Sequence, residues 1–447
     1  MKQLLRRGGA LCLILLLCAA VLAPASAAED QGAGALTILF THDTHDRFLP
    51  VPDEEGGEYG GYTRLATLLR QERAAAETPV VTLDAGDFSM GSLFQTIYAT
   101  DAPELRALGQ MGYDVTTLGN HEFDYRARGL AEMLGAAVDS GDRLPAVVQA
   151  NYKPPAGDGA TRAAWENYGI GDYVVLERDG VRVAVFGLLG VDADECAPMS
   201  GMEFTPLAQA AQRVVETIQA QEAADYIVCL SHSGTTDGKG EDYELAKAVD
   251  GIDVIISGHT HSATQEPIRV NDTLIVSCGE YTRNLGVLTV EKTGEGLDTL
   301  DFRLVPIDET VTEDAAMTAM ARRFQQKVDE GYLAGFGLSF HQVLCESAFA
   351  FTPIRRFAQQ QQEDPLGSLI ADSYVYAVEQ AEGEDYRTVD FAVVAAGVVR
   401  ASFAAGEITT SDAFNVSSLG SGADGTPGYP LVSVWLTGRE LKDVFEV

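Results

Sequence analysis

The stretch "DVTTLGNHEFDY" at residues 114–125 joins a β-branched run to a cluster of polar side chains. Asn120, His121, Glu122 and Asp124 follow the apolar part within five positions. Each of these four side chains can bind a metal ion or take part in proton transfer. One such cluster is also typical of an ordinary polar loop. A functional site here therefore requires partners from other parts of the chain.

Four further apolar runs end in the same residue types. They are "LTILFTHDTHD" (36–46), "PVVTLDAGD" (79–87), "YIVCLSHSG" (226–234) and "DVIISGHTHS" (253–262). The chain holds seven histidines, and six of them lie in these five segments. Ligands of open α/β sheets bind beyond the carboxyl ends of the strands. We therefore expect the Asp, Asn and His side chains to converge on one place.

The spacing of apolar residues predicts an α/β fold. Short β-branched runs alternate with helical stretches such as 60–77 and 206–223. This alternation predicts a first α/β domain over residues 35–308. A mostly polar helix is expected within a linker at 309–338. A second domain over 339–447 is expected to contain a helix at 365–381 and strands at 389–397 and 431–438.

Composition and the N-terminal residues limit the partners and the location of the protein. The 447 residues include 46% hydrophobic ones, enough for a sizeable core, and the formal net charge of −35 excludes binding to a nucleic-acid polymer by counterion release. A basic start followed by a short apolar run predicts a secretory signal peptide at residues 1–27. The mature chain would then be secreted, periplasmic or at the cell surface, without a membrane span. Lipoprotein processing at Cys18 is the alternative.

The residue types in the five clusters indicate a metal site. Imidazole and carboxylate groups together suit Zn²⁺, Mn²⁺ or Fe. Asp43 and His45 stand two positions apart, as do His259 and His261, so each pair can face one cavity if its segment is extended. Two cations about 3.5–4 Å apart can bind a phosphoryl group and activate water for in-line displacement. Because the chain is acidic, a phosphate site needs its own positive charge.

Together, "THDTH", "LDAGD", "GNHEFD", "LSHSG" and "GHTH", in this order and at these spacings, resemble the calcineurin-like metallophosphoesterases. The sequence is most similar to the secreted 5′-nucleotidase family with its UDP-sugar hydrolases and 2′,3′-cyclic phosphodiesterases. The resemblance implies a metallophosphoesterase sandwich of two mixed sheets flanked by helices. It also implies a smaller α/β substrate-recognition domain of the 5′-nucleotidase C-terminal type, which we expect to be incomplete at its C-terminal end.

The same resemblance implies a set of ligands for two divalent metal ions. The ligands of the first metal would be Asp43, His45, Asp87 and His261. The ligands of the second would be Asp87, Asn120, His232 and His259. Asp87 would bridge the two ions.

The resemblance further implies how a phosphate ester would be bound and cleaved. A hydroxide that bridges the metals would attack phosphorus in line, and His121 would contact the phosphate and assist the leaving group. Asp124 would orient the His121 ring. Arg400, in the segment "GVVRASF", would contact the substrate phosphate together with Asn120 and His121. The expected substrate is a small phosphate ester such as a nucleotide.

Several positions depart from the family pattern. Gln360, Ala395 and Leu419 stand where family members have an arginine, an asparagine and a base-stacking aromatic residue. These departures leave the exact substrate open. His42 replaces a usual asparagine, and we expect it to point away from the metals as an ordinary polar residue. Asp84 is expected to brace its loop by hydrogen bonds.

Two other functions remain open from the sequence. The first is a non-catalytic cell-surface binding protein on the same scaffold, which the complete set of metal ligands disfavours. The second is a sulfur-ester hydrolase of the same superfamily, for which the altered recognition positions leave room. The sequence leaves the metal identity and the oligomeric state undetermined.

Overall fold

The structure is a computed structural model of the chain. It describes residues 34–53, 57–236, 238–294, 296–357, 359, 362–422 and 425–446. The predicted signal peptide at 1–27 and the departure at Gln360 lie outside these residues, so both stay predictions. Within the described part of the chain, no helix combines the length and the apolar character that crossing a bilayer requires.

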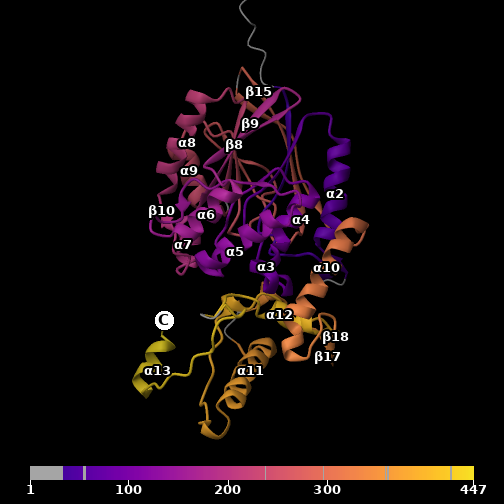
Figure 1. Ribbon diagram of the computed structural model, residues 1–447, viewed down its shortest axis with the longest axis vertical. Coiled ribbons are helices and arrows are strands. Elements are labelled where there is room, and N and C mark those ends of the chain that lie inside the picture. Colours follow the sequence, from indigo (N-terminus) through magenta and orange to yellow (C-terminus); the bar gives the residue numbers. More distant parts are fainter. Residues whose placement is uncertain are drawn as a thin grey trace, which may run out of the picture.

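Two mixed six-stranded sheets form the first part of the molecule (Figure 1). The strand order of the first sheet is β16 (Gly296–Pro306), β15 (Asn284–Thr293), β1 (Leu36–Thr41), β4 (Val80–Asp84), β5 (Val115–Thr116) and β6 (Ala146–Val147). The order of the second is β13 (Ile268–Val270), β14 (Thr273–Val276), β12 (Val254–Ser257), β11 (Tyr226–His232), β9 (Val181–Leu189) and β8 (Tyr173–Arg178). This architecture confirms the predicted fold class.

Both faces of the central strands are buried, which explains their nearly continuous apolar sequences. On β11, Val228 and Leu230 pack in the layer between the two sheets, where strands of both sheets contribute. Ile227 and Cys229 point to the opposite face and pack under helices. Because successive side chains alternate between faces, a strand with apolar residues at successive positions needs cover on both of its faces.

Helices cover the outer faces of the two sheets, as Figure 1 shows. The helices over the first sheet include α2 (Tyr62–Ala75), α4 (Pro103–Met111) and α5 (Arg126–Asp139). The helices over the second are α8 (Leu207–Gln221) and α9 (Glu241–Ala248). The helix expected in the linker corresponds to α10 (Ala315–Gly331), which buries Met317, Met320 and Phe324 against α2, α4 and the segment at 93–97. It is thus packed on the sandwich rather than standing alone.

The C-terminal region is smaller and more loosely packed. It contains β17 (Val343–Ser347), β18 (Gly406–Thr409), α11 (Pro365–Glu382), α12 (Thr410–Val416) and α13 (Gly438–Val444). Helix α11 confirms the helix predicted at 365–381. The strands predicted at 389–397 and 431–438 are wrong, because these residues form no strand and the second segment leads into α13. A high β propensity does not produce a strand where no neighbouring strand accepts its hydrogen bonds.

The C-terminal region contacts the sandwich at the end that carries the polar strand ends. Gln95 Nε2 donates to the carbonyl oxygen of Ser418 at 2.5 Å. Ser421 Oγ donates to the carbonyl oxygen of Asp124 at 2.7 Å. Aromatic packing of Phe94 on Phe340, with ring centroids 5.3 Å apart, adds to the contact. The loop at 418–421 is therefore held beside the loop that carries His121 and Asp124.

Candidate active site

The structure brings the seven predicted metal ligands together at one end of the sandwich. Strands β1, β4 and β5 run parallel to one another in the first sheet, as do β11 and β12 in the second. The ligands therefore follow the carboxyl ends of neighbouring strands. Three groups of potential ligand atoms form there, each with its atoms within 4.8 Å of one another: Asp43–His45–His261, His45–Asp87–His121 and Asp87–His232–His259.

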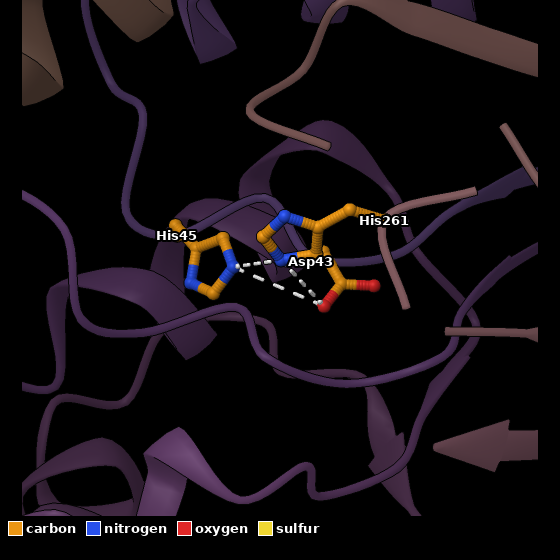
Figure 2. A group of neighbouring side chains, drawn as sticks. All are labelled: Asp43, His45 and His261. Carbon is orange, nitrogen blue, oxygen red and sulfur yellow. Dashed lines mark hydrogen bonds and ion pairs between the residues drawn. The ribbon is translucent and has the colours of Figure 1, made fainter. Parts of the chain in front are cut away.

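The first group consists of Asp43, His45 and His261 (Figure 2). His261 Nε2 lies 3.3 Å from Asp43 Oδ1 and 3.0 Å from His45 Nε2. His45 Nδ1 lies 3.0 Å from the carbonyl oxygen of Met90 and donates to it, so Nε2 of the neutral ring is an acceptor. Burial and the neighbouring His261 lower the pKa of His45 well below its usual value. Neutral His45 therefore directs a lone pair at this group.

Asp43 Oδ1 in this group is buried without a hydrogen-bond partner among the described residues. A carboxylate oxygen in that position is costly unless a cation or a proton sits against it. The lone pairs of His45 and the carboxylate of Asp43 converge on the same small volume. The residues present therefore fit a divalent metal ion.

The second group consists of Asp87, Asn120, His232 and His259. His232 Nε2 lies 3.1 Å from Asp87 Oδ2 and 3.2 Å from Asn120 Oδ1, while Nδ1 donates to the carbonyl oxygen of Ala85 at 2.9 Å. Burial opposes a charge on His232, but the Asp87 carboxylate outweighs it and raises the pKa of His232 to about 10. In the absence of a cation, a proton on Nε2 offsets the charge of Asp87. A metal ion would displace that proton.

The backbone is bent sharply at the ligands. Five of the seven have positive φ angles: Asp43 (50°), His45 (46°), Asp87 (53°), His259 (72°) and His261 (55°). Residues other than glycine seldom adopt this backbone conformation. It costs about 1–3 kcal/mol per residue and is concentrated at functional sites. These bends bring the ligand side chains close to one another at the strand ends. The extended pairs expected from the sequence are therefore replaced by tight left-handed turns.

Two buried carboxylates brace the loops beneath the ligands. Glu122 accepts hydrogen bonds from the backbone N–H groups of Asp87 (3.0 Å), Ser89 (2.9 Å) and Gly119 (2.6 Å). Burial, together with the charge of Asp87, raises the pKa of Glu122 to about 7. Asp84 accepts from Gly86 N–H at 3.1 Å and from two threonine hydroxyls. Asp84 thus has the bracing contacts that the sequence led us to expect.

Gly119 is required at the point where the two loops meet. A Cβ atom at Gly119 would lie 2.2 Å from Asp87 Oδ1 and 2.7 Å from His232 Cε1. Only glycine therefore allows the loop after β5 to approach the second group so closely. The glycine of the "GNHEFD" motif makes room for the metal ligands.

His121 and Asp124 form a hydrogen-bonded pair beside the metal groups. His121 Nδ1 lies 2.8 Å from Asp124 Oδ2, and the backbone N–H of His121 donates to Asp87 Oδ1 at 2.9 Å. Burial opposes the charged form, but Asp124 and Asp87 outweigh it and raise the pKa of His121 to about 9. With Nδ1 held by Asp124, Nε2 is the nitrogen that can face a substrate. The pair can therefore hold a proton at the edge of the metal groups.

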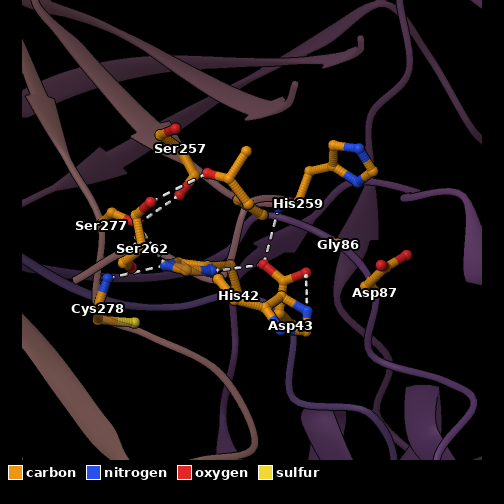
Figure 3. Close-up of polar contacts among 12 residues, drawn as sticks. His42, Asp43, Gly86, Asp87, Ser257, His259, Ser262, Ser277 and Cys278 are labelled. Atoms are coloured by element: carbon orange, nitrogen blue, oxygen red, sulfur yellow. Dashed lines mark hydrogen bonds and ion pairs between the residues drawn. The ribbon is translucent and has the colours of Figure 1, made fainter. Parts of the chain in front are cut away.

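His42 is not the ordinary polar residue that we expected. It is buried, its Nδ1 donates to Asp43 Oδ2 at 2.6 Å, and its Nε2 accepts from the backbone N–H of Cys278 at 2.8 Å (Figure 3). His42 thus ties a metal ligand of the first sheet to the segment after β14 of the second. No local sequence pattern indicates this contact, because Cys278 lies 236 positions away.

A tyrosine and two arginines border the first group. The Tyr281 ring centroid lies 5.0 Å from that of His45. The guanidinium carbons of Arg47 and Arg400 lie 4.9 Å and 5.9 Å from the same tyrosine ring. Sequence reasoning anticipated Arg400 but missed Arg47 and Tyr281. The strongly acidic chain thus directs two positive charges toward the rim of its metal groups.

The two described recognition departures lie in the C-terminal region. Ala395 and Leu419 both line a cavity of about 1070 Å³ that is bordered by α11 and by residues 428–436. Their side chains are small and aliphatic, so they offer neither an amide nor an aromatic ring to a base. At these two positions a base would therefore meet only apolar contacts.

A sandwich of two mixed sheets with Asp/His groups at its strand ends defines the class of metal-binding phosphoesterase folds. The chain belongs to the calcineurin-like phosphoesterase family, which matches residues 36–263. Residues 346–447 match the 5′-nucleotidase C-terminal domain. The predicted family is thereby confirmed.

Similar proteins and one similar solved structure support these family matches. The trifunctional nucleotide phosphoesterase of Bacillus subtilis is 28% identical over 93% of this chain, but the chain spans only 28% of that protein. The 5′-nucleotidase of Vibrio cholerae is 27% identical over 95% of this chain and 77% of its own length. The structure of a 5′-nucleotidase precursor from Thermus thermophilus has a TM-score of 0.67 and 24% identity, covering 86% of this chain and 73% of that one. This structure supports the fold.

Proposed function

We propose that the protein is an exported two-metal phosphohydrolase that cleaves phosphate esters of nucleotides or related compounds. The observation that carries the proposal is the position of Asp87. It lies close to His45, a member of the first group, and also to His232 and His259 of the second group. The names of the Bacillus and Vibrio relatives support a nucleotide substrate. Export rests on the predicted signal peptide alone.

Two divalent cations would be held by the residues of the two groups. Asp43, His45 and His261 would hold one, and Asn120, His232 and His259 the other, with Asp87 between them. When bound, the cations would supply Lewis acidity and lower the pKa of a water molecule that attacks phosphorus in line. The buried Oδ1 of Asp43, which accepts no hydrogen bond among the described residues, supports this assignment.

The side chains around the metals would bind the phosphate and move the proton. Arg400 would bind phosphate oxygens and offset the charge that develops on them. His121, kept protonated by Asp124, would deliver its Nε2 proton to the ester oxygen as the P–O bond breaks. Arg47 would add a second positive charge at the rim.

The experiment that tests the proposal is a panel assay of the full chain loaded with Mn²⁺, Zn²⁺ or Co²⁺. The substrates are nucleoside 5′-monophosphates, 2′,3′-cyclic nucleotides, UDP-sugars, an aryl phosphate and a sulfur ester. We expect turnover of at least one nucleotide class with at least one metal. Metal binding without turnover of any substrate would contradict the proposal and favour a binding protein. Turnover of the sulfur ester alone would also contradict it.

A further inference from the structure

His259 is held differently from two other histidines of the metal groups. His45 and His232 each donate Nδ1–H to a backbone carbonyl, of Met90 and of Ala85. In His259 it is Nε2 that is engaged, and its partner is a carboxylate: Asp192 Oδ2 lies 2.8 Å from it. Asp192 comes from α7 (Val191–Cys196) and belongs to none of the polar motifs described above.

The position of Asp192 is fixed by contacts of its own backbone. The N–H groups of Val191 and Asp192 donate to the Glu241 carboxylate at 2.8 Å and 3.0 Å. The N–H of Gly190 donates to the carbonyl oxygen of His232 at 2.8 Å. A Cβ atom at Gly190 would lie 2.5 Å from Ser233 Cβ, so the close approach of α7 to β11 needs glycine. The start of α7 is therefore held against the end of β11 and the start of α9.

The backbone of His259 is also fixed, by a hydrogen bond to a ligand of the first group. Its N–H donates to Asp43 Oδ2 at 2.9 Å (Figure 3). With Nε2–H donated to Asp192, the lone pair of the neutral ring is on Nδ1. Nδ1 is then the nitrogen that can serve the group of Asp87 and His232. A carboxylate on the far nitrogen orients such a ring and makes it a stronger ligand.

We propose that Asp192 is a positioning residue that fixes the tautomer and orientation of His259 and thereby strengthens metal binding in the second group. The inference rests on the proposed function, because it assumes that His259 is a ligand. The side chain of Asp192 is 70% exposed, so removal of its carboxylate leaves the core intact. Its effect is on metal affinity and not on folding.

A competing explanation involves the neighbouring thiol. Asp192, Cys196 and His259 place potential ligand atoms within 4.8 Å of one another, which could form a separate, peripheral cation site. Burial, together with Asp192 and other carboxylates, raises the pKa of the Cys196 thiol, and this disfavours a thiolate ligand. In the positioning role Cys196 is dispensable, whereas a peripheral site needs it. Cys196→Ser therefore separates the two explanations.

The test compares Asp192→Ala, Asp192→Asn and Cys196→Ser with the unaltered full chain. Mn²⁺ is titrated into metal-free protein, and free Mn²⁺ is followed by electron paramagnetic resonance. We expect Asp192→Ala to weaken one Mn²⁺ by about 10–100-fold and to leave the other unchanged. Asp192→Asn keeps an oxygen acceptor for Nε2–H, so we expect a smaller loss. Cys196→Ser should bind both ions as before.

A matched control and a second measurement complete the test. Glu195→Ala removes the same charge from an exposed position of the same helix and should leave Mn²⁺ binding unchanged. The ¹⁵N chemical shifts of His259 in the metal-free protein should report an Nε2–H tautomer that Asp192→Ala converts to a mixture. Unchanged Mn²⁺ affinity and unchanged shifts in Asp192→Ala would overturn the inference. An equal loss in Glu195→Ala or Cys196→Ser would overturn it too. Failure of the proposed function would instead appear as absent turnover in unaltered, metal-loaded protein.

Discussion

Similar apolar sequences form a buried strand in the sandwich but no strand in the C-terminal region. In the sandwich, the β-branched run of β12 is fully paired, and Val254 has no exposed surface. In the C-terminal region, the run at 431–436 is equally apolar but forms no strand, and Val432 and Trp435 are 76% and 79% exposed. An extended apolar segment is ordered as a strand only where a neighbour accepts its backbone hydrogen bonds.

This difference separates two kinds of functional residue. The predicted metal ligands follow paired strands, so their backbones are fixed on both sides. Arg400 and the residues around Leu419 are carried by short helices and loops. We therefore expect substitutions in the sandwich to remove metal or chemistry. Substitutions in the C-terminal region should change substrate binding and leave the metals in place.

The largest effect is expected from Asp87→Asn. This change keeps the shape of the side chain but removes the charge between the two groups, next to His232 Nε2 at 3.1 Å. Metal stabilisation worth several kcal/mol would be lost, which corresponds to about 10³-fold or more in turnover. Metal content after dialysis and kcat measure the effect, and Asp139→Asn on an exposed helix end is the control. Full metal content and normal turnover in Asp87→Asn would show that Asp87 does not bind the metals.

The second-largest effect is expected from His121→Ala. This variant tests the catalytic step separately from metal binding. The variant should retain both metals and lose about 10²–10⁴-fold in kcat, the usual contribution of a general acid. The loss should be smaller for an aryl phosphate with a good leaving group, because such a group needs less protonation. An equal loss for all leaving groups would argue against proton donation by His121.

Much of the sandwich could be predicted because its strand ends have a local signature. Polar residues such as Asp87 and His232 directly follow apolar runs, so one segment reveals both the strand and the ligand. The left-handed turns at these residues were not predicted, since their strain is compensated by the surrounding fold.

The missed residues act over long distances in the sequence. His42 reaches the backbone of Cys278, 236 positions away, and Asp192 reaches His259, 67 positions away. A pattern in one segment cannot indicate such contacts. The strands predicted at 389–397 and 431–438 failed for a related reason. Pairing depends on the rest of the fold, and propensity alone does not supply it.

A smaller effect is expected in the C-terminal region from Arg400→Ala. A charge-assisted hydrogen bond to phosphate is worth about 1.5–3 kcal/mol, so KM should rise about 10–100-fold. Arg400→Lys keeps the charge without the planar fork and should recover part of the loss. Metal content should be unchanged, and Arg439→Ala on the exposed α13 is the control. If Arg400→Ala releases metal, the separation between the two regions fails.

The smallest effect is expected from Ser421→Ala, which removes one contact between the regions. Ser421 Oγ donates to the carbonyl oxygen of Asp124, while the Asp124 carboxylate holds His121. Loss of one neutral hydrogen bond costs about 1 kcal/mol, which corresponds to about fivefold in KM. The exposed Ser417→Ala is the matched control. Because the bond joins only the backbone of Asp124, kcat should stay unchanged. A fall in kcat like that of His121→Ala would mean that the C-terminal loop also positions the proton donor, and the two regions would then share the chemistry.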